Sequence, residues 1–487
     1  MSSPHGQAAA DGWRTLLSPR FLGTSILLAG GVALYATNEF LTVSLLPSAI
    51  ADIGGERLYA WVTTLYLVGS VVAATTVNAL LLRIGPRVSF LLGLIVFGIG
   101  SVVCALAPGM EVLLMGRTLQ GTAGGLLAGL GYALINTALP RSLWTRASAL
   151  VCARWGVATV TGPAAGGLFA QFGLWRWAFG VMAILAVAMV VLVPRVLPAR
   201  VDSGEAAPAL KVPVWSIVLL GTAALTISVA QVPTNVGLTA ALLAISVALV
   251  GAFILVDRRM AVKVLPPSVF GSGPLKWIYL ALAVLMASAM VDMYVPLFGQ
   301  RLAHLVPVAA GFLGAALAIG WAVSEVLSAS LSSRKVINRV VVFGPLVIAF
   351  GLALAAATQV DNAPAGLVVT WALALTITGI GIGAAWPHLS AWSMQCIDDE
   401  AEGAAAAAAI NTIEVIAGAF GAGLAGVIVN SAHGGAVMAA RWLFAVFAAL
   451  GVVGALAAHR AIRNLRCATS AARPNVKPVS PDGGRMG

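Results

Sequence analysis

Long apolar stretches, separated by short polar or basic turns, follow one another along almost the whole chain. Each stretch is long enough for a helix to cross a bilayer, which takes about 20 residues. The pattern therefore predicts fourteen membrane-spanning helices, with ends placed at breaks in hydropathy. The predicted segments are about 22–48, 59–82, 88–107, 112–138, 147–171, 176–197, 214–232, 237–256, 276–299, 307–331, 340–358, 366–393, 404–430 and 440–460.

These segments are arranged as six, two and six, which predicts an all-α polytopic membrane protein with two pseudo-symmetric six-helix bundles. The middle pair is joined by an uncharged turn, Gln231-Val-Pro-Thr-Asn-Val-Gly237, so a re-entrant hairpin is an alternative to two full spans there. The expected parts are a cytoplasmic N-terminal segment (1–20), an N-terminal six-helix bundle (21–200), a linker with two extra transmembrane helices (201–273), a C-terminal six-helix bundle (274–462) and a disordered cytoplasmic tail (463–487).

Composition supports the membrane assignment and changes how the charge is interpreted. The chain is 60% hydrophobic and 9% charged, whereas a soluble domain has about 25% charged residues. A net charge of +11 in a soluble protein would suggest nucleic acid. In a membrane protein, however, the positive-inside rule explains such an excess. We therefore expect membrane lipid, and not nucleic acid, around this chain.

The distribution of basic residues predicts the orientation. With the N-terminus inside, most of the 28 Lys and Arg residues fall in cytoplasmic segments. This bias predicts that both termini are cytoplasmic, and it would disappear if the number of spans were odd. The exceptions are Arg57, Arg176, Arg301 and Arg441 in the outside loops, and Arg117 and Arg154 within spans.

Acids inside the predicted spans are the first candidates for function, because a charge in the membrane normally faces a cavity or a partner. Glu39 and Arg117 lie at similar depths, about nine and six residues from the outer ends of their spans, so we expect them to be close. Burial favours the neutral form of a carboxyl and a nearby cation favours the charged form, so such a pair suits a proton carrier. A permanent structural ion pair is the alternative.

Further polar residues lie at inner positions of other predicted helices. Asn38 is next to Glu39, and Gln120 is almost one turn from Arg117. Asp292 lies in the predicted helix 276–299, and Asn411 and Glu414 lie in 404–430. Together they predict a wet cavity between the two halves, although Asp292 and Glu414 are equally compatible with structural hydrogen bonds.

An internal repeat is faintly visible. A short basic turn, Arg83-Ile-Gly85-Pro-Arg87, connects the second and third spans. A similar basic turn, Arg334 to Arg339, connects the corresponding spans of the second half. Matching features in two six-span halves favour a transporter built from parallel repeats around a midplane site.

Residues 162–167, Gly-Pro-Ala-Ala-Gly-Gly, lie within an apolar span, although glycine and proline disfavour a helix interior. In lipid such small residues allow neighbouring helices to approach closely. The run resembles the antiporter motif of the major facilitator superfamily. The stretch Arg117-Thr-Leu-Gln120-Gly121 resembles the second motif of that family. Asn38-Glu39 followed by Pro47 is similar to the first-span motif of its fourteen-span drug:proton antiporters.

The chain departs from the family pattern at several positions. In the loop after the second span, Leu82 stands where an Asp is usual, Asn78 where a Gly is usual and Pro86 where a basic residue is usual. In the first span the usual Asp aligns with Asn38, and the acid comes one residue later at Glu39. That shift rotates the carboxyl by about 100° around the helix.

The resemblance implies a proton-coupled exporter of amphipathic or lipophilic small molecules that works by alternating access in a bacterial plasma membrane. It implicates Arg117 in proton coupling, and the carboxyl of Glu39 at a similar depth adds that residue as the proton carrier. It also implies a monomer, driven by the proton gradient without a cofactor. Finally, it assigns gating and packing roles to the loop motif and to the motif of the fifth span. Their residues are Arg83, Gly85 and Arg87 in the loop and Gly162, Pro163, Gly166 and Gly167 in the fifth span.

Four alternatives stay open at this stage. An exporter of endogenous lipid or glycolipid would share all these features, and an importer is disfavoured by the antiporter-like motif. A membrane-embedded enzyme would need clustered His, Asp or Ser residues at the membrane boundary, and the sequence shows none. A passive channel would not need an acid paired with an arginine. The four cysteines have no CxxC spacing, so neither a disulfide framework nor a metal site is expected.

Overall fold

The computed structural model describes residues 13–16, 18–74, 76–134, 144–197, 214–233, 235–260, 264–265, 267–271, 273–396 and 400–471. Every regular element in this part of the chain is a helix, which confirms the prediction of an all-α protein. Eleven helical stretches here are long and apolar enough to cross a membrane. The chain is therefore a multi-pass membrane protein.

Within the described residues, each of the fourteen predicted segments contains a helix. The first group is α2 (Pro19–Ile53), α3 (Tyr59–Ala74), α4 (Val77–Ala105), α5 (Met110–Ala133), α7 (Trp144–Gln171) and α8 (Trp175–Val196). The middle pair is α9 (Val214–Val229) and α10 (Val236–Arg259). The last group is α11 (Leu275–Ala289), η5 (Met290–Tyr294), α12 (Val295–Ala303), α13 (Pro307–Ala329), α14 (Arg334–Thr358), α15 (Ala365–Gln395), α16 (Glu400–Ser431) and α17 (Gly435–Ala471). Short helices α1 (Trp13–Leu16), η2 (Glu56–Leu58) and η4 (Pro267–Phe270) complete the order.

At two places the observed helices begin and end differently from the predicted spans. The boundary between the second and third predicted spans falls inside α4, at Gly85, whose φ of 79° and ψ of 170° interrupt the helix. Glycine adopts a positive φ without the steric penalty of a Cβ, and Pro86 then starts the next helical run. The seventh predicted span is likewise divided, because the 3-10 segment η5 separates α11 from α12.

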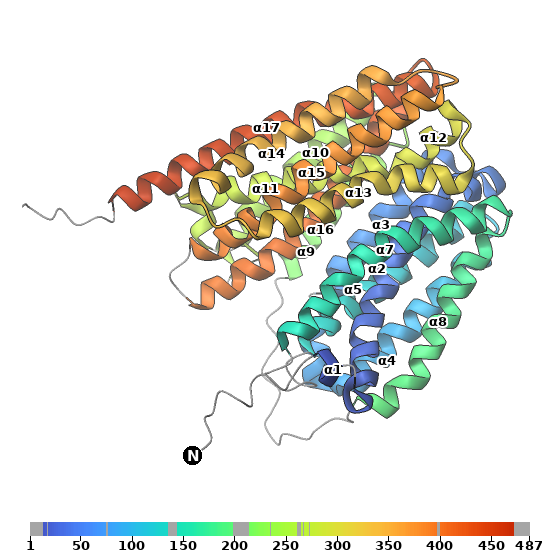
Figure 1. Cartoon of the computed structure of the whole chain (residues 1–487), viewed down its shortest axis with the longest axis horizontal. Helices are drawn as coiled ribbons and strands as arrows, with labels where there is room; N and C mark the ends of the chain where they lie inside the picture. Colours follow the sequence, from blue (N-terminus) through green and yellow to red (C-terminus); the bar gives the residue numbers. More distant parts are fainter. Residues whose placement is uncertain are drawn as a thin grey trace, which may run out of the picture.

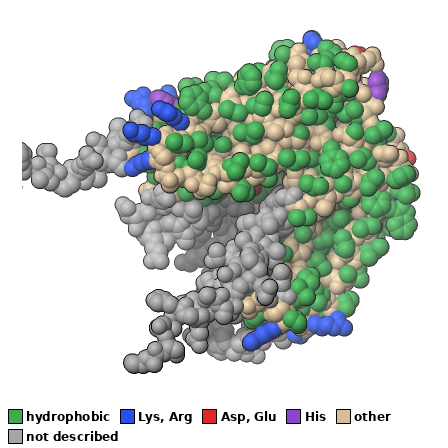
Figure 2. Space-filling model, in the orientation of Figure 1, with side chains coloured by type: hydrophobic (Ala, Val, Ile, Leu, Met, Phe, Trp, Pro, Cys, Tyr) green, Lys and Arg blue, Asp and Glu red, His purple; other side chains and the backbone are tan. Residues whose placement is uncertain are grey.

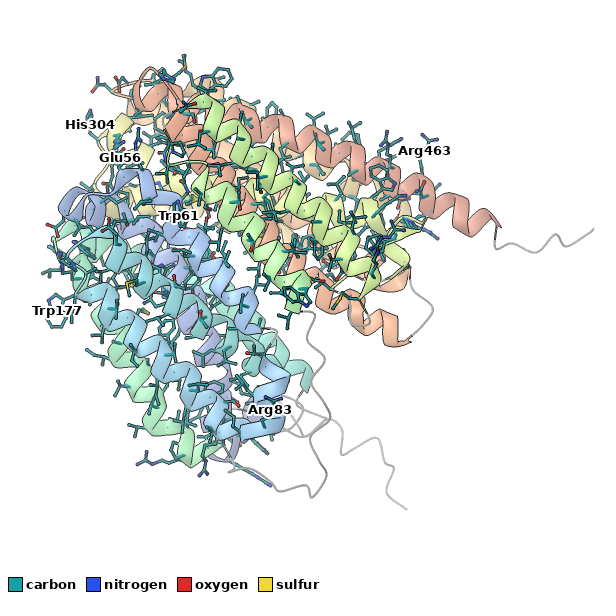
Figure 3. The ribbon with its side chains drawn as sticks, turned by 180° about the vertical axis from the view of Figure 1, so that it is seen from behind. Glu56, Trp61, Arg83, Trp177, His304 and Arg463 are labelled. Atoms are coloured by element: carbon teal, nitrogen blue, oxygen red, sulfur yellow. The ribbon has the colours of Figure 1, made fainter. Side chains whose placement is uncertain are left out.

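The helices form two bundles (Figure 1). The N-terminal bundle contains α2 to α8, and the C-terminal bundle contains α11 to α17. Helix α9 packs against α3 of the first bundle and α16 of the second, and α10 packs on the outside of α9. Viewed from behind, this pair lies over the C-terminal bundle beside the junction with the first (Figure 3).

The surface matches a protein embedded in lipid. On the visible face, hydrophobic side chains cover the flanks of both bundles, and Lys and Arg side chains gather at their ends (Figure 2). Besides the short helices α1 and η4, three helices fall outside the eleven apolar stretches. Helix α9 has only 16 residues, and α5 and α7 contain runs of small and polar residues that pack against other helices.

The two bundles repeat the same close helix contact. In the first bundle a Cβ on Gly121 of α5 would lie 2.1 Å from the carbonyl oxygen of Tyr66 in α3. In the second, a Cβ on Gly379 of α15 would lie 1.9 Å from the carbonyl oxygen of Leu317 in α13. Only glycine allows the backbones to come this close. One turn further along, the contact recurs in each bundle at Gly125 and Gly383.

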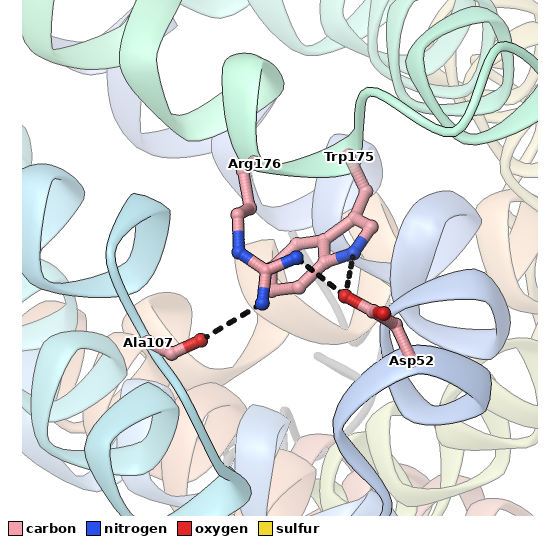
Figure 4. Close-up of polar contacts among 4 residues, drawn as sticks. All are labelled: Asp52, Ala107, Trp175 and Arg176. Atoms are coloured by element: carbon pink, nitrogen blue, oxygen red, sulfur yellow. Dashed lines mark hydrogen bonds and ion pairs between the residues drawn. The ribbon is translucent and has the colours of Figure 1, made fainter.

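A second repeated feature is an arginine at the start of the last helix of each bundle. Arg176 of α8 donates a hydrogen bond to the carbonyl oxygen of Ala107, at 3.2 Å (Figure 4). Arg441 of α17 donates two hydrogen bonds to the carbonyl oxygen of Gln359, at 2.9 and 3.1 Å. Ala107 and Gln359 each follow the third helix of their bundle. The two halves are therefore related by architecture, as the sequence repeat indicated.

Arg176 also binds the C-terminal end of α2. Its guanidinium forms an ion pair with Asp52 and stacks over the Trp175 ring, 4.3 Å from the ring centroid (Figure 4). The indole N–H of Trp175 donates to the same carboxylate oxygen at 3.2 Å. These contacts connect α2, α8 and the α4–α5 turn at one end of the first bundle.

The repeated glycine contact generates a stability prediction. Gly379→Ala places a methyl group against the α13 backbone, so we expect it to destabilise the protein by about 1–3 kcal/mol through overpacking. Gly98→Ala is the matched control, because a Cβ there meets nothing closer than a Cβ at 3.7 Å. Thermal unfolding of the purified protein in detergent measures both. Equal melting temperatures for the two variants would contradict the proposed close contact.

Candidate functional site

Three of the predicted site residues form one buried hydrogen-bond network in the N-terminal bundle. The side-chain oxygen of Gln120 accepts from Arg117 Nη1 at 2.9 Å and from Asn38 Nδ2 at 3.3 Å. The amide of Gln120 donates to the Ser101 hydroxyl at 2.9 Å. Helices α2, α4 and α5 each contribute a residue, so the close packing of these helices positions the network.

Arg117 is only 1% exposed, and neutral groups surround its guanidinium. The ring of Tyr66 lies under it, with the guanidinium carbon 4.0 Å from the ring centroid. The carbonyl oxygen of Val62 accepts from Nε at 3.4 Å. A buried cation loses its hydration, and hydrogen bonds together with a cation–π contact offset part of that loss. Tyr66 was not among the predicted site residues, because its residue type alone does not mark a ring that lies under a buried arginine.

Glu39 lies at the edge of this network and not inside it. Its carboxyl interacts electrostatically with Arg117, yet no ion pair joins the two side chains, both of which belong to the described part of the chain. Asn38, one residue earlier, is fully buried and reaches Gln120, whereas Glu39 is partly exposed. The permanent ion pair considered above is therefore absent from this conformation. The 100° rotation between consecutive residues explains the different environments of Asn38 and Glu39.

Glu39 lies near acids of the other bundle. Its helix α2 packs against η5, which carries Asp292, and η5 packs against α16, which carries Glu414, so the charges of these carboxyls act on one another. Glu414 also interacts with Glu325 of α13. Acids from both bundles thus share one region between the bundles. The side chain of Asn411 lies outside the described residues. Within the described residues, no three His, Cys, Asp or Glu side chains are close enough together to hold a metal ion.

The bundles are held together at one end. We call the end at which Glu56 and His304 lie the outer end, and the end at which Arg83 and Arg463 lie the inner end (Figure 3). Among the described residues, the hydrogen bonds from Tyr59 and Asn430 and the ion pair of Arg301 join the two bundles at the outer end. Toward the inner end the bundles diverge (Figure 1).

Aromatic residues form the centre of the outer closure. Tyr59 of α3 donates its hydroxyl to the carbonyl oxygen of Met293 in η5 at 2.9 Å. The rings of Tyr59 and Tyr294 stack with centroids 4.6 Å apart. Arg301 and Glu56 form an ion pair beside them. Asp292 is the residue directly before Met293, so one acid of the shared region is part of the same segment as the closure.

The glycine-rich motif of α7 contacts both bundles. A Cβ on Gly162 would lie 2.5 Å from Phe40, and one on Gly166 would lie 2.3 Å from the carbonyl oxygen of Leu41, so both residues pack α7 against α2. Gly167 points the other way, where a Cβ would lie 2.6 Å from the Cα of Val308 in α13. Pro163 follows Gly162 within the helix, and its carbonyl oxygen lies close to Gly311 of α13.

The basic loop motif makes contacts within the first bundle. Arg87 donates to the carbonyl oxygen of Leu197 at 2.9 Å and to that of Pro194 at 3.1 Å, which secures the end of α8. Gly85 forms the kink described above, and Arg83 is exposed at the inner end (Figure 3). A gating role for this loop stays a prediction.

Glu325 and His388 have local partners. Glu325 accepts a hydrogen bond from the indole N–H of Trp321 at 3.0 Å. His388 lies 2.9 Å from the Ser328 hydroxyl, which agrees with a local hydrogen bond. The side chain of Arg154 is outside the described residues. Asp257, which the sequence analysis did not single out, is fully buried at the end of α10.

The chain is similar to known transporters over most of its length. A family profile described as Major Facilitator Superfamily matches residues 28–422. A protein of Mycobacterium tuberculosis with the description "probable multidrug-efflux transporter" is 66% identical over 453 residues, which cover 92% of this chain and 96% of that protein. The match to this relative therefore extends over nearly the whole of both chains.

Solved structures share the fold at low sequence identity. A nucleoside transporter superposes with a TM-score of 0.63 at 13% identity, covering 89% of this chain and 99% of that chain. A bacterial homologue of the human lysosomal transporter Spinster, in an inward-facing and occupied conformation, gives a TM-score of 0.61 at 12% identity, covering 92% and 97%. At such identities the likeness concerns the arrangement of helices alone.

The buried network generates the second prediction. Gln120→Leu removes the acceptor shared by Arg117 and Asn38, so we expect a loss of about 1–3 kcal/mol because buried donors are left unpaired. Ser101→Ala is the control, since it removes only the hydroxyl that accepts from the Gln120 amide and keeps the shared acceptor. Thermal unfolding in detergent compares the variants. If Ser101→Ala cost as much as Gln120→Leu, Gln120 would not be the centre of the network.

Proposed function

Because the chain belongs to the major facilitator superfamily, we propose that it exports amphipathic or lipophilic small molecules, including drugs, in exchange for protons. It is a transporter and not an enzyme. The bacterial relative described as a multidrug-efflux transporter supports the substrate class. The proposed motion is alternating access, in which the two six-helix bundles rock around the region that they share.

One observation carries the proton-coupling part of the proposal: the elements that carry Glu39, Asp292 and Glu414 pack together where the two bundles meet, so the carboxyl of Glu39 lies near acids of the opposite bundle. Ionised carboxylates that share a poorly hydrated space repel one another. A proton bound to one of them removes that repulsion, and a cationic group of a substrate relieves it in a similar way. Proton and substrate therefore compete for the same charges, and this competition is the thermodynamic basis of exchange.

Arg117 sets the electrostatic potential of the region without occupying it. Its hydrogen bonds and its aromatic contact hold it inside the N-terminal bundle, while its charge still acts on Glu39. Since no ion pair fixes Glu39 to Arg117, the Glu39 carboxyl is able to take up and release a proton. In this proposal Asn38 and Gln120 position the arginine, and Glu39 carries the proton.

The closed outer end supports a cycle that loads substrate from the opposite side. With both termini in the cytoplasm, as the basic residues predict, the diverging inner end faces the cytoplasm and the inner leaflet. Substrate would enter there and leave after the outer end opens. Gly162, Gly166 and Gly167, which bring α7 against α2 and α13, would keep the closed end impermeable to protons. We further propose that the protein acts as a monomer in the plasma membrane.

The test uses proteoliposomes with an imposed pH gradient and a trapped pH-sensitive dye. Lipophilic cations, antibiotics and lipids are added one at a time. We expect a compound-triggered movement of protons that falls to the level of empty liposomes in Glu39→Gln, because glutamine keeps the shape of the side chain and binds no proton. Glu111→Gln, which changes an exposed acid at the start of α5, is the control and should transport normally.

Other outcomes separate the alternatives. Full proton movement in Glu39→Gln would overturn the assignment of Glu39. A response to lipids with none to drugs would favour export of an endogenous lipid or glycolipid. Compound flux that is independent of the pH gradient would indicate a passive channel.

A further inference from the structure

We infer that the inserted helix pair α9–α10 is a latch for the outer end, fastened to the C-terminal bundle and hydrogen-bonded across the junction to the N-terminal bundle. The latch depends on three residues at the outer end, Arg57, Asn430 and Gln231. The inference goes beyond the proposed transport function, since it concerns two helices that are not part of either six-helix bundle.

The inner end of the pair is attached to the C-terminal side. Asp257 at the end of α10 is fully buried and accepts from the Ser216 hydroxyl of α9 at 2.8 Å. The same carboxylate accepts from the backbone N–H groups of Val264 and Leu265 at 2.8 and 3.0 Å. These two residues lie just before η4, in the segment that leads to α11, the first helix of the C-terminal bundle. One buried carboxylate therefore ties both inserted helices to the start of that bundle.

Along its length, α9 covers the junction between the two bundles. On one side the Ser228 hydroxyl donates to the Thr64 hydroxyl of α3 at 3.1 Å. On the other side Gly423 of α16 lies against α9, where a Cβ would be 2.7 Å from Ile227. Helix α10, in contrast, packs on α9 and leaves most of its surface facing outward. The contacts with both bundles therefore come from α9 and its outer turn.

At the outer end, the turn after α9 is hydrogen-bonded to both bundles. Arg57, just before α3, donates to the carbonyl oxygen of Val232 at 3.1 Å. Asn430 of α16 donates to the carbonyl oxygen of Arg57 at 2.9 Å and to that of Gln231 at 3.3 Å. These three bonds connect the N-terminal bundle, the C-terminal bundle and the inserted pair at one point. Separation of the bundles at this end must break the bonds made to Arg57.

The same point contains a group that favours opening. Gln231 is 1% exposed, and neither polar atom of its side-chain amide has a hydrogen-bond partner. The amide lies against Gly426 of α16, where a Cβ would be 2.0 Å from its oxygen, with Ala60 of α3 close by. A buried amide without partners is unfavourable, and separation of the bundles would let water reach it. The closed junction therefore balances the hydrogen bonds of Arg57 and Asn430 against the buried amide of Gln231.

This balance predicts that substitutions at Asn430 and Arg57 shift the ratio of outer-open to outer-closed molecules in one direction and a substitution at Gln231 shifts it in the other. Asn430→Ala removes donors that hold the junction closed, and we expect the ratio of outer-open to outer-closed molecules to rise by roughly 2- to 10-fold, the range for one hydrogen bond. Arg57→Ala should act in the same direction, and Arg57→Lys should restore part of the closure. Gln231→Met keeps the length of the side chain and removes the unpaired amide, so the ratio should fall. A residue that merely supports the fold would not produce opposite shifts.

The measurement is a distance distribution between spin labels on the full-length protein in lipid nanodiscs. Glu111→Cys and His433→Cys place labels at exposed positions on the outer ends of the two bundles, in a background without the four native cysteines. No substrate and no gradient is present, so the result does not depend on the proposed transport activity. Ser246→Ala is the matched control, because it removes only a bond inside the inserted pair, from Ser246 to the carbonyl oxygen of Ala223.

Longer distances in Asn430→Ala and Arg57→Ala, shorter ones in Gln231→Met and no change in Ser246→Ala would establish the latch. An unchanged distribution in both Asn430→Ala and Arg57→Ala would overturn it. A shift in Ser246→Ala as large as that in Asn430→Ala would also overturn it, since general loosening of the pair would then explain the effect. A second label pair placed within one bundle reports whether each variant is folded.

Discussion

Close backbone contact at glycine is the constraint on which this structure depends. Lipid tails are as apolar as leucine, so helices in a bilayer gain little from burying apolar side chains against one another. They associate through close packing and through polar contacts. Gly121 and Gly379 bring equivalent helices together inside the two bundles, and Gly167 brings α7 against α13 between them. The interior of each bundle and the junction between the bundles therefore use the same kind of contact.

The interior of the N-terminal bundle and the junction between the bundles differ in how many of their buried polar groups are hydrogen-bonded. Inside the N-terminal bundle the packed helices enclose a hydrogen-bond network around Arg117, in which Asn38 Oδ1 is the one atom without a partner among the described residues. The junction between the bundles is incomplete by comparison. Several of its buried polar groups, among them the Tyr294 hydroxyl and the Gln231 amide, have no hydrogen-bond partner. A junction whose polar groups are only partly satisfied is separated at a smaller cost than a bundle interior.

Hydropathy was sufficient to predict all fourteen helices, because a membrane helix must bury every backbone polar group and so needs a long apolar run. The kink at Gly85 was also accessible, since a Gly-Pro pair marks a helix boundary. The closure of the outer end was not. Its hydrogen bonds end on the carbonyl oxygens of Met293, Arg57 and Gln231, and a backbone acceptor leaves no trace in residue type.

The sequence predicted which residues belong to the site, but not how their side chains are arranged. Charge and depth indicated that Glu39 and Arg117 belong to one region, but a shift of one residue decides which side chain enters the buried network. Asn38 occupies the inward position and donates a hydrogen bond to the network from a neutral amide, so the acid at Glu39 is left at the boundary with the other bundle. An acid at the inward position would lie beside Arg117 and be held there as an ion pair. At the boundary, Glu39 instead interacts with the acids of the opposite bundle, so its charge depends on how the two bundles are arranged. The departure from the family pattern at these two residues therefore moves the ionisable group from a place where helix packing fixes it to a place where bundle movement changes its surroundings.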